Sequence, residues 1–204
     1  MEKLLGTLKK GLVFVISAPA GTGKTTLVRM LVDEFSVVKE SVSCTTRPPR
    51  PGEIAEKDYD FLNKATFEAE VAAGEFLEHA EVFGTHYGTL KSHVLEEQNK
   101  GNHVVLVIDT QGALELKKSK FPATFIFVQP PSLSELRQRL FKRKTEKDEH
   151  IEERLSWAQG ELEKANHYDY IIVNDNLHRA FEILRCIFIA EEHKNRGNHG
   201  RYDK

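Results

Sequence analysis

A short loop between a buried strand and a helix constrains this chain more than any other feature of its sequence. Residues 12–16 form a continuous apolar run, which is typical of a strand buried on both faces of a parallel sheet. Beyond the loop, apolar residues recur at helical spacing from Leu27 to Phe35. The loop itself reads Ala18–Pro19–Ala20–Gly21–Thr22–Gly23–Lys24–Thr25. A strand, a glycine-rich loop ending in Lys-Thr and a helix, in that order, predict a loop that binds phosphate groups.

Each residue type in this loop suits that role. Backbone N–H groups from Gly21 to Lys24 can surround phosphate oxygens. The Lys24 ammonium is expected to reach the β- and γ-phosphates of ATP, and the Thr25 hydroxyl is expected to hold Mg²⁺. The usual pattern begins with glycine where this chain has Ala18, so an ordinary strand–turn–helix connection is the alternative interpretation. The residues predicted here to bind ATP are Ala18, Pro19, Ala20, Gly21, Thr22, Gly23, Lys24, Thr25 and Thr26.

The rest of the chain alternates between strand and helix patterns. Further buried-type strands are predicted at 104–108, 124–128 and 170–173. Ser132 and Glu135 form a capping box that opens a helix over 133–143, and Asn176 is expected to cap the last helix. This order predicts an α/β fold with a mainly parallel sheet. The apolar face of the last helix is expected at Phe181, Leu184, Cys186 and Ile187.

Two segments interrupt the alternation. Residues 41–93 contain several prolines and many charges, which predicts an inserted subdomain. Residues 137–157 are densely charged with few apolar positions, which predicts an exposed, mobile helical hairpin. The remaining core comprises about residues 1–40, 94–136 and 158–190, and the polar residues 191–204 are expected to form a disordered tail.

Composition limits the classes of function. A length of 204 residues suits one domain, and a formal net charge of -2 gives no general attraction to nucleic acid or membrane surfaces. Cys44 and Cys186 form no CxxC pattern, and no apolar stretch approaches the length of a membrane span. A cytoplasmic protein is expected, and the sequence leaves open whether it is a monomer or a homodimer.

A second group of polar residues follows the first helix. Arg47 and Arg50 lie on a proline-rich loop, and their guanidinium groups can each hold a phosphate through two hydrogen bonds. Tyr59 and Tyr87 can add hydroxyl donors to the same phosphate. The alternative is an exposed loop that turns at Pro48 and Pro49.

The run from Ser43 to Phe61 carries a family resemblance. It matches the pattern S-x-T-T-R-x-P-R-x-G-E-x-x-x-x-D-Y-x-F, and residues 12–184 as a whole resemble the guanylate kinase family. The resemblance implies a three-layer fold of the P-loop nucleoside triphosphate hydrolase type, with an inserted GMP-binding subdomain and a helical lid. It also implies that the GMP-binding residues are Ser43, Arg47, Arg50, Tyr59, Glu78, Tyr87, Thr89 and Asp109.

In that family Glu78 accepts hydrogen bonds from guanine N1–H and the 2-amino group, Thr89 helps at guanine O6, and Asp109 lies near the guanine and the waters bound to the metal. The lid arginines match Arg139, Arg143 and Arg154, and Asn174 matches a residue near the adenine. Two departures are Val107, where the family often has a second acid, and Lys144, where it commonly has glycine.

The implied reaction is transfer of the γ-phosphate of ATP to GMP or dGMP. The acceptor oxygen is already an anion, so no general base is needed, and catalysis should be positioning and charge stabilisation. Two alternatives stay open: a non-catalytic guanylate-kinase-like binding module, and another small-molecule P-loop kinase. The residues expected to act in catalysis are Lys24, Arg47, Arg139, Arg143 and Arg154.

Overall fold

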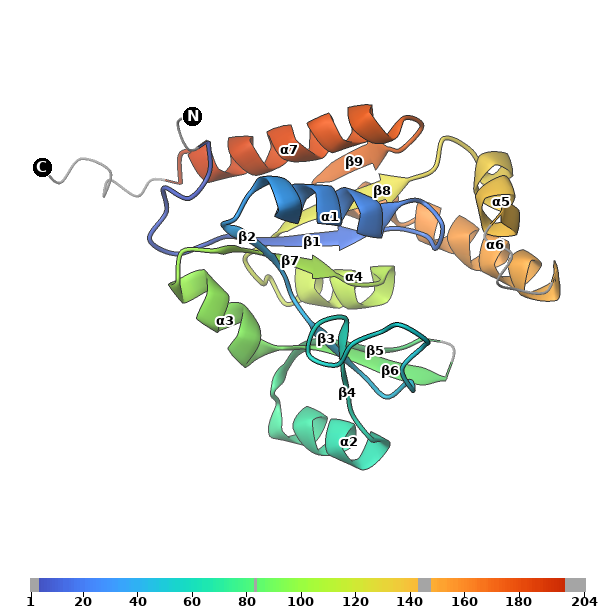
Figure 1. Ribbon diagram of the computed structural model, residues 1–204, viewed down its shortest axis with the longest axis horizontal. Helices are drawn as coiled ribbons and strands as arrows, with labels where there is room; N and C mark the ends of the chain where they lie inside the picture. The colour runs from blue at the N-terminus through green and yellow to red at the C-terminus, as the bar shows by residue number, and fades with distance from the viewer. Residues whose placement is uncertain (1–3, 83, 143–147, 197–204) are drawn as a thin grey trace, which may run out of the picture.

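A five-stranded parallel sheet forms the centre of the molecule (Figure 1). The computed structural model describes residues 4–82, 84–142 and 148–196. The strand order is β2–β7–β1–β8–β9, and every pair is parallel. Strands are predicted correctly in four of the five places, whereas the short edge strand β2 was missed. Their bounds are β1 Val13–Ser17, β2 Val38–Glu40, β7 His103–Val107, β8 Thr124–Gln129 and β9 Tyr170–Val173.

Helices cover both faces of this sheet, which confirms the α/β prediction. α1 (Lys24–Glu34) and α7 (Leu177–His193) pack on one face, and α4 (Thr110–Lys118) packs on the other (Figure 1). Successive side chains of β1 point to opposite faces of the sheet and so contribute to both core clusters. Phe14 and Ile16 point into one cluster, and Val13 and Val15 point into the other. Asn176 caps α7 as predicted, since its Oδ1 accepts from the Arg179 N–H at 3.0 Å.

The predicted insertion contains a second sheet of its own. The strand order is β4–β3–β6–β5, with β3 and β4 parallel and the other pairs antiparallel. Phe67 and Phe76 stack beside Cys44 to form a small separate core. This sheet lies below α4 in Figure 1, away from the central sheet. Its elements are β3 Ser43–Thr45, β4 Tyr59–Phe61, α2 Lys64–Ala73, β5 Phe76–Val82 and β6 Thr85–Leu90, followed by α3 Lys91–Asn99.

The charged hairpin consists of α5 (Leu133–Lys142) and α6 (Asp148–Leu162), beside the carboxyl end of β1 (Figure 1). The Ser132 Oγ accepts from the Glu135 N–H at 3.1 Å, as the capping prediction requires. The expectation of an exposed hairpin is wrong for the inner faces of these helices. Leu136 and Leu140 are buried against α6, because a helix needs only one apolar residue per turn to form a packed stripe.

The expectation of a disordered tail from residue 191 is wrong for the residues that the structure describes there. Helix α7 continues to His193, and Glu191 and Glu192 are buried. The predicted apolar face of α7 also needs one correction, because Cys186 is exposed while Phe188 is fully buried. The prediction of a disordered tail failed because it treated glutamates as exposed residues, whereas a carboxylate can be buried when it is fully hydrogen-bonded.

Glu192 accepts such hydrogen bonds at the far end of the sheet from the phosphate loop. Its carboxylate accepts from the backbone N–H groups of Gly6 and Thr7, each at 2.8 Å, and from the Thr7 hydroxyl at 2.6 Å. The His103 Nδ1 accepts from the Leu12 N–H at 3.0 Å, so its Nε2 carries the proton and donates to Glu192 Oε2 at 2.5 Å. This carboxylate therefore ties the N-terminal segment and strand β7 to α7.

We expect Glu192→Gln to lower the free energy of unfolding by roughly 1–3 kcal/mol. Burial alone would raise the pKa of Glu192, but the hydrogen bonds from Thr7, Gly6 and His103 outweigh it and lower the pKa to about 2. This stabilisation is present above the unfolded-state carboxyl pKa and is lost as pH falls toward 2. Urea unfolding from pH 7 to pH 3 measures it. Equal loss in Glu182→Gln, at an exposed site on α7, would contradict the assignment.

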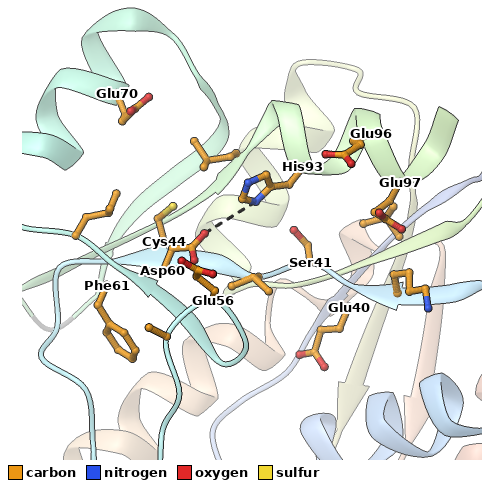
Figure 2. A pocket seen from close by; sticks show the side chains of 16 residues that line it. Glu40, Ser41, Cys44, Glu56, Asp60, Phe61, Glu70, His93, Glu96 and Glu97 are labelled. Carbon is orange, nitrogen blue, oxygen red and sulfur yellow. Dashed lines mark ion pairs between the residues drawn. The ribbon is translucent and has the colours of Figure 1, made fainter. Parts of the chain in front are cut away.

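A cavity of about 700 Å³ lies between the second sheet, β2 and α3 (Figure 2). Its lining is rich in carboxylates, including Glu40, Asp60 and Glu96, and His93 Nδ1 lies 4.0 Å from Asp60 Oδ2. None of the predicted site residues that the structure describes lines this cavity. Within the described residues, no helix is long and apolar enough to cross a membrane.

Candidate active site

The phosphate loop joins the carboxyl end of β1 to the first turn of α1. Gly21 and Gly23 have φ angles of 88° and 94°, a region of backbone conformation that favours glycine. Gly23 is the N-cap of α1, so the first backbone N–H groups of the helix face the loop. The free N–H groups and the helix dipole together make this turn suited to an anion.

Ala18 fits the loop although the usual pattern has glycine at this place. Among the described residues, positive φ angles outside glycine occur only at Glu56 and Lys120, so the backbone at Ala18 tolerates a side chain. The Ala18 methyl is buried in the same core cluster as Phe14 and Ile16. The departure therefore costs the loop nothing in backbone conformation.

Helix α5 and Asn174 hold the loop from outside. The Asn174 Nδ2 donates to the Thr22 carbonyl at 2.7 Å, and the Arg139 guanidinium donates to the Asn174 carbonyl at 3.0 Å. A Cβ atom on Gly21 would lie 3.0 Å from the Leu140 side chain. The structure thus brings Asn174 and Arg139 to the phosphate loop, with Arg139 also paired to Glu135 at 3.1 Å.

Of the other two predicted lid arginines, only Arg154 lies within the described residues. Arg154 lies half-buried on α6, the helix that packs against α5 through Leu155 and Ala158. Arg143 and Lys144 lie outside the described residues. The assignment of all three arginines to a lid over ATP stays a prediction.

Lys24 lies in an acidic environment under the loop. Its Nζ donates to the Ile108 carbonyl at a long 3.4 Å. Burial lowers the pKa of Lys24, while the carboxylates of Glu161, Asp109 and Glu40 act against that shift. The ammonium is therefore held near the end of β7 by weak interactions, which leaves it able to bind a phosphate anion.

The acceptor side gathers Arg47 and the two tyrosines on the second sheet. The Arg47 guanidinium lies 5.3 Å from the centre of the Tyr59 ring, and the rings of Tyr59 and Tyr87 are 6.1 Å apart. Ser43 is the strand partner of Tyr59 in the register of β3 and β4. The Arg50 side chain is exposed to solvent and extends from the same loop.

Glu53 is a residue of this cluster to which the sequence reasoning gave no role. Its carboxylate accepts two hydrogen bonds from the Arg47 guanidinium, at 3.0 and 2.8 Å, and one from the Arg50 N–H at 2.7 Å. One acid thus fixes both the side chain of one arginine and the backbone of the other. The sequence could have indicated this role, because Glu53 ends the R-x-x-R-x-x-E run that begins with Arg47 and Arg50.

Glu78 and Thr89 form a buried pair between β5 and β6. They are direct partners in the antiparallel register, and the Thr89 hydroxyl donates to Glu78 Oε1 at 2.7 Å. Glu78 is only 6% exposed and Thr89 is fully buried. Burial raises the pKa of Glu78 to about 7, against the opposing effect of the Thr89 hydrogen bond. The pair places one carboxylate in a poorly solvated position.

Asp109 connects the two halves of the site. It follows β7 and caps α4, with its Oδ1 accepting from the Gly112 N–H at 2.8 Å. Its charge acts on Lys24 and also raises the pKa of Glu78. Lys24 bonds to the carbonyl of Ile108 and Glu78 Oε2 lies beside Gly112, so the phosphate loop and the Glu78–Thr89 pair both lie near the N-terminus of α4.

Glu161 is a second acid that the sequence reasoning missed. It lies near the end of α6, and the Thr110 hydroxyl donates to its Oε1 at 3.3 Å. Burial raises its pKa, while the charge of Lys24 lowers it. No local sequence pattern marks this residue, because only the packing of α6 brings it to Lys24.

The residues present fit Mg²⁺ held mainly by substrate and water. Thr25 lies in the first turn of α1 with its side chain exposed. Within the described ranges, no group of three or more His, Cys, Asp and Glu side chains is arranged to hold a metal ion. Mg²⁺ commonly keeps several waters and takes substrate phosphates as ligands, so the Thr25 hydroxyl beside the phosphate loop is a sufficient protein ligand for it.

Comparisons with known proteins all indicate one family. Residues 10–191 match the family model described as guanylate kinase. A guanylate kinase of Protochlamydia amoebophila is 54% identical over 189 residues, covering 93% of this chain and 95% of that protein. One of Chlamydia trachomatis serovar D is 48% identical over 183 residues, covering 89% of each.

A solved structure supports the same relationship. The crystal structure of guanylate kinase from Anaplasma phagocytophilum superposes with a TM-score of 0.75 at 34% identity, covering 91% of this chain and 88% of that one. The family model spans most of the sequence, and the relatives match it over nearly their whole length. The chain therefore belongs to the guanylate kinase family.

Proposed function

We propose that this chain transfers the γ-phosphate of ATP to GMP, and to dGMP, giving ADP and the corresponding diphosphate. The observation that carries the proposal is the meeting of two groups near Asp109. Lys24 donates to the carbonyl of the preceding residue, Ile108, and the carboxylate of the buried Glu78–Thr89 pair lies beside Gly112 of α4, as Asp109 does. A phosphate-binding lysine and a carboxylate able to recognise a base thus both lie near the N-terminus of α4. The family membership supports the same reaction.

Glu78 suits guanine because guanine presents two N–H donors on one edge, and an ionised carboxylate can accept both. Adenine presents an acceptor at N1, which would leave the buried carboxylate unpaired. An unpaired buried charge costs several kcal/mol. The Thr89 hydroxyl orients the carboxylate, and Ser43 lies on the neighbouring strand β3.

The acceptor phosphate is assigned to Arg47, Arg50, Tyr59 and Tyr87. Glu53 holds Arg47 through two hydrogen bonds, so this guanidinium is preorganised before substrate arrives. Preorganised groups lose less entropy when substrate binds and keep reacting atoms in line. The acceptor oxygen is already an anion, so no side chain has to remove a proton.

The donor phosphates are assigned to the loop from Ala18 to Thr26, with Asn174 near the adenine. Lys24 and the lid arginines Arg139, Arg143 and Arg154 would neutralise charge that develops on the transferred group. Thr25 would hold Mg²⁺, which supplies positive charge to the phosphate oxygens when bound. Closure over both substrates would exclude water as a competing acceptor.

The test is ADP release from ATP–Mg²⁺ with GMP, dGMP, AMP, CMP or UMP as acceptor. We expect rates with GMP to exceed those with AMP by at least about 100-fold, the discrimination expected from one mispaired buried charge. Equal or faster ADP release with AMP contradicts the guanine assignment.

The same assay distinguishes the binding-module alternative, which predicts GMP binding without ADP release. Lys24 and Thr25 argue for catalysis, because a binding module has no use for a triphosphate site. A cytoplasmic location is proposed on the cysteines: Cys44 and Cys186 are both free thiols, which suits a reducing compartment.

A further inference from the structure

The first turn of α4 contains a glycine whose backbone does not require one. Gly112 is the third residue of α4 and is not among the glycines with positive φ. Alanine is the better helix former by about 1 kcal/mol at such a position. A reason other than backbone conformation therefore excludes a side chain here.

That reason is the carboxylate of Glu78. A Cβ atom added to Gly112 would lie 2.3 Å from Glu78 Oε2, closer than non-bonded atoms approach, and 3.2 Å from Glu78 Cδ, which is a tight contact. The next atom is Asp109 Oδ1, at 3.4 Å. Glu78 comes from β5 in the second sheet, whereas Gly112 belongs to the core, so this contact joins the two parts of the molecule.

Glu78 has little freedom to move aside without consequence. It is 6% exposed, and its other oxygen accepts from the buried Thr89 hydroxyl at 2.7 Å. A side chain at 112 would press on the end of a flexible side chain and not on backbone, so the fold would survive. The carboxylate would have to leave its position, its Thr89 hydrogen bond or both.

We propose that Gly112 is a positioning residue for base recognition. By having no side chain it leaves, on the first turn of α4, the space that the Glu78 carboxylate occupies. It thereby sets where that carboxylate meets the two donors of guanine. This inference rests on the proposed function, in which Glu78 binds guanine, and it adds a residue of the core to the specificity of that site.

The test compares Gly112→Ala with Gly160→Ala. Gly160 lies inside α6, also without a positive φ, and a Cβ atom there would meet nothing within 4 Å. The two variants make the same chemical change in two helices, but only one of them contacts Glu78. Initial rates are measured with GMP and ATP varied separately, with IMP as a second acceptor, beside GMP binding by calorimetry and thermal unfolding.

For Gly112→Ala we expect the KM and the dissociation constant for GMP to rise about 10- to 100-fold, as expected when hydrogen bonds to a charged group are misplaced. The KM for ATP should change less than about twofold, because the donor loop is untouched. The preference for GMP over IMP should shrink. IMP lacks the 2-amino donor, so it makes fewer hydrogen bonds to Glu78 and loses less binding free energy when the carboxylate moves. Gly160→Ala should match the parent enzyme in every kinetic constant.

A rescue variant separates positioning from general damage. Glu78→Asp shortens the side chain and makes room for a methyl group at 112. Because the two residues touch, their effects should not add: adding Gly112→Ala to Glu78→Asp should raise the KM for GMP by less than about threefold, against the larger rise in the parent enzyme. Full additivity overturns the proposal, as does an unchanged KM for GMP in Gly112→Ala.

The remaining outcomes are equally decisive. Failure of Gly112→Ala to fold contradicts the proposal, because it requires Glu78 to move and the backbone to stay. If the unaltered enzyme prefers another mononucleotide to GMP, the proposed function fails. The positioning role then stands only if Gly112→Ala raises the KM for that acceptor and leaves the KM for ATP unchanged.

Discussion

We expect Lys24→Met to lose most of the phosphoryl transfer, with kcat lowered by at least about 100-fold. The change removes the ammonium and keeps a side chain of similar length. The lysine Nζ donates a long 3.4 Å hydrogen bond to the Ile108 carbonyl and lies among the carboxylates of Glu161, Asp109 and Glu40. Without the ammonium, less positive charge offsets the phosphates, and these carboxylates repel them.

The fold should not suffer from this substitution. Burial already lowers the pKa of Lys24, so the charged form is disfavoured in the folded protein, and removing it costs no stability. The measurements are steady-state kinetics and thermal unfolding. The control is Lys64→Met, on α2, where the side chain is 70% exposed. Activity in Lys24→Met within a few-fold of the parent contradicts the assignment of the phosphate loop.

The sequence was sufficient for features that repeat locally. The runs at 13–16 and 125–128 are apolar throughout because both faces of a parallel strand are covered. The phosphate loop was equally readable, because its glycines and Lys24 lie together in the chain. The pairing of Glu78 with Thr89 depends on strand register, and there the family resemblance supplied what local pattern does not.

What could not be read from the sequence depends on packing between distant segments. Glu192 looked like part of a polar tail, yet hydrogen bonds from residues 6 and 7 and from His103 allow its burial. Glu161 reaches Thr110 only because α6 crosses back to the core. The proposed role of Gly112 depends on a contact between β5 and α4, which the sequence of either segment alone does not predict.

The second large prediction concerns Glu78, whose ionised carboxylate is expected to bind guanine and also to lower the stability of the fold. Burial is the main cause that raises the pKa of Glu78 to about 7. Between the unfolded-state pKa and 7, the folded protein binds a proton that the unfolded chain has released, so stability falls as pH rises through this range. The total is on the order of 3 kcal/mol. Glu78→Gln should therefore raise the melting temperature at pH 8.

The same substitution should remove guanine recognition. Only the ionised carboxylate accepts both guanine donors, whereas the glutamine amide presents a donor to them, so kcat/KM for GMP should fall at least about 100-fold. In the parent enzyme the ionised fraction falls as pH drops through 7, so the KM for GMP should rise about tenfold from pH 8 to pH 6. This pH dependence should be absent in Glu78→Gln.

Steady-state kinetics across pH 6 to 8 and calorimetric unfolding at pH 8 measure both effects. Glu81→Gln, an exposed position on the same strand β5, is the matched control and should resemble the parent in both. A flat KM for GMP across this range in the parent enzyme would mean that Glu78 is not the group that reads the base. A Glu78→Gln variant that melts lower than the parent would mean that the buried carboxylate stabilises the fold. A single carboxylate whose removal raises stability and destroys recognition would show that this site keeps an unfavourable buried charge because guanine requires it.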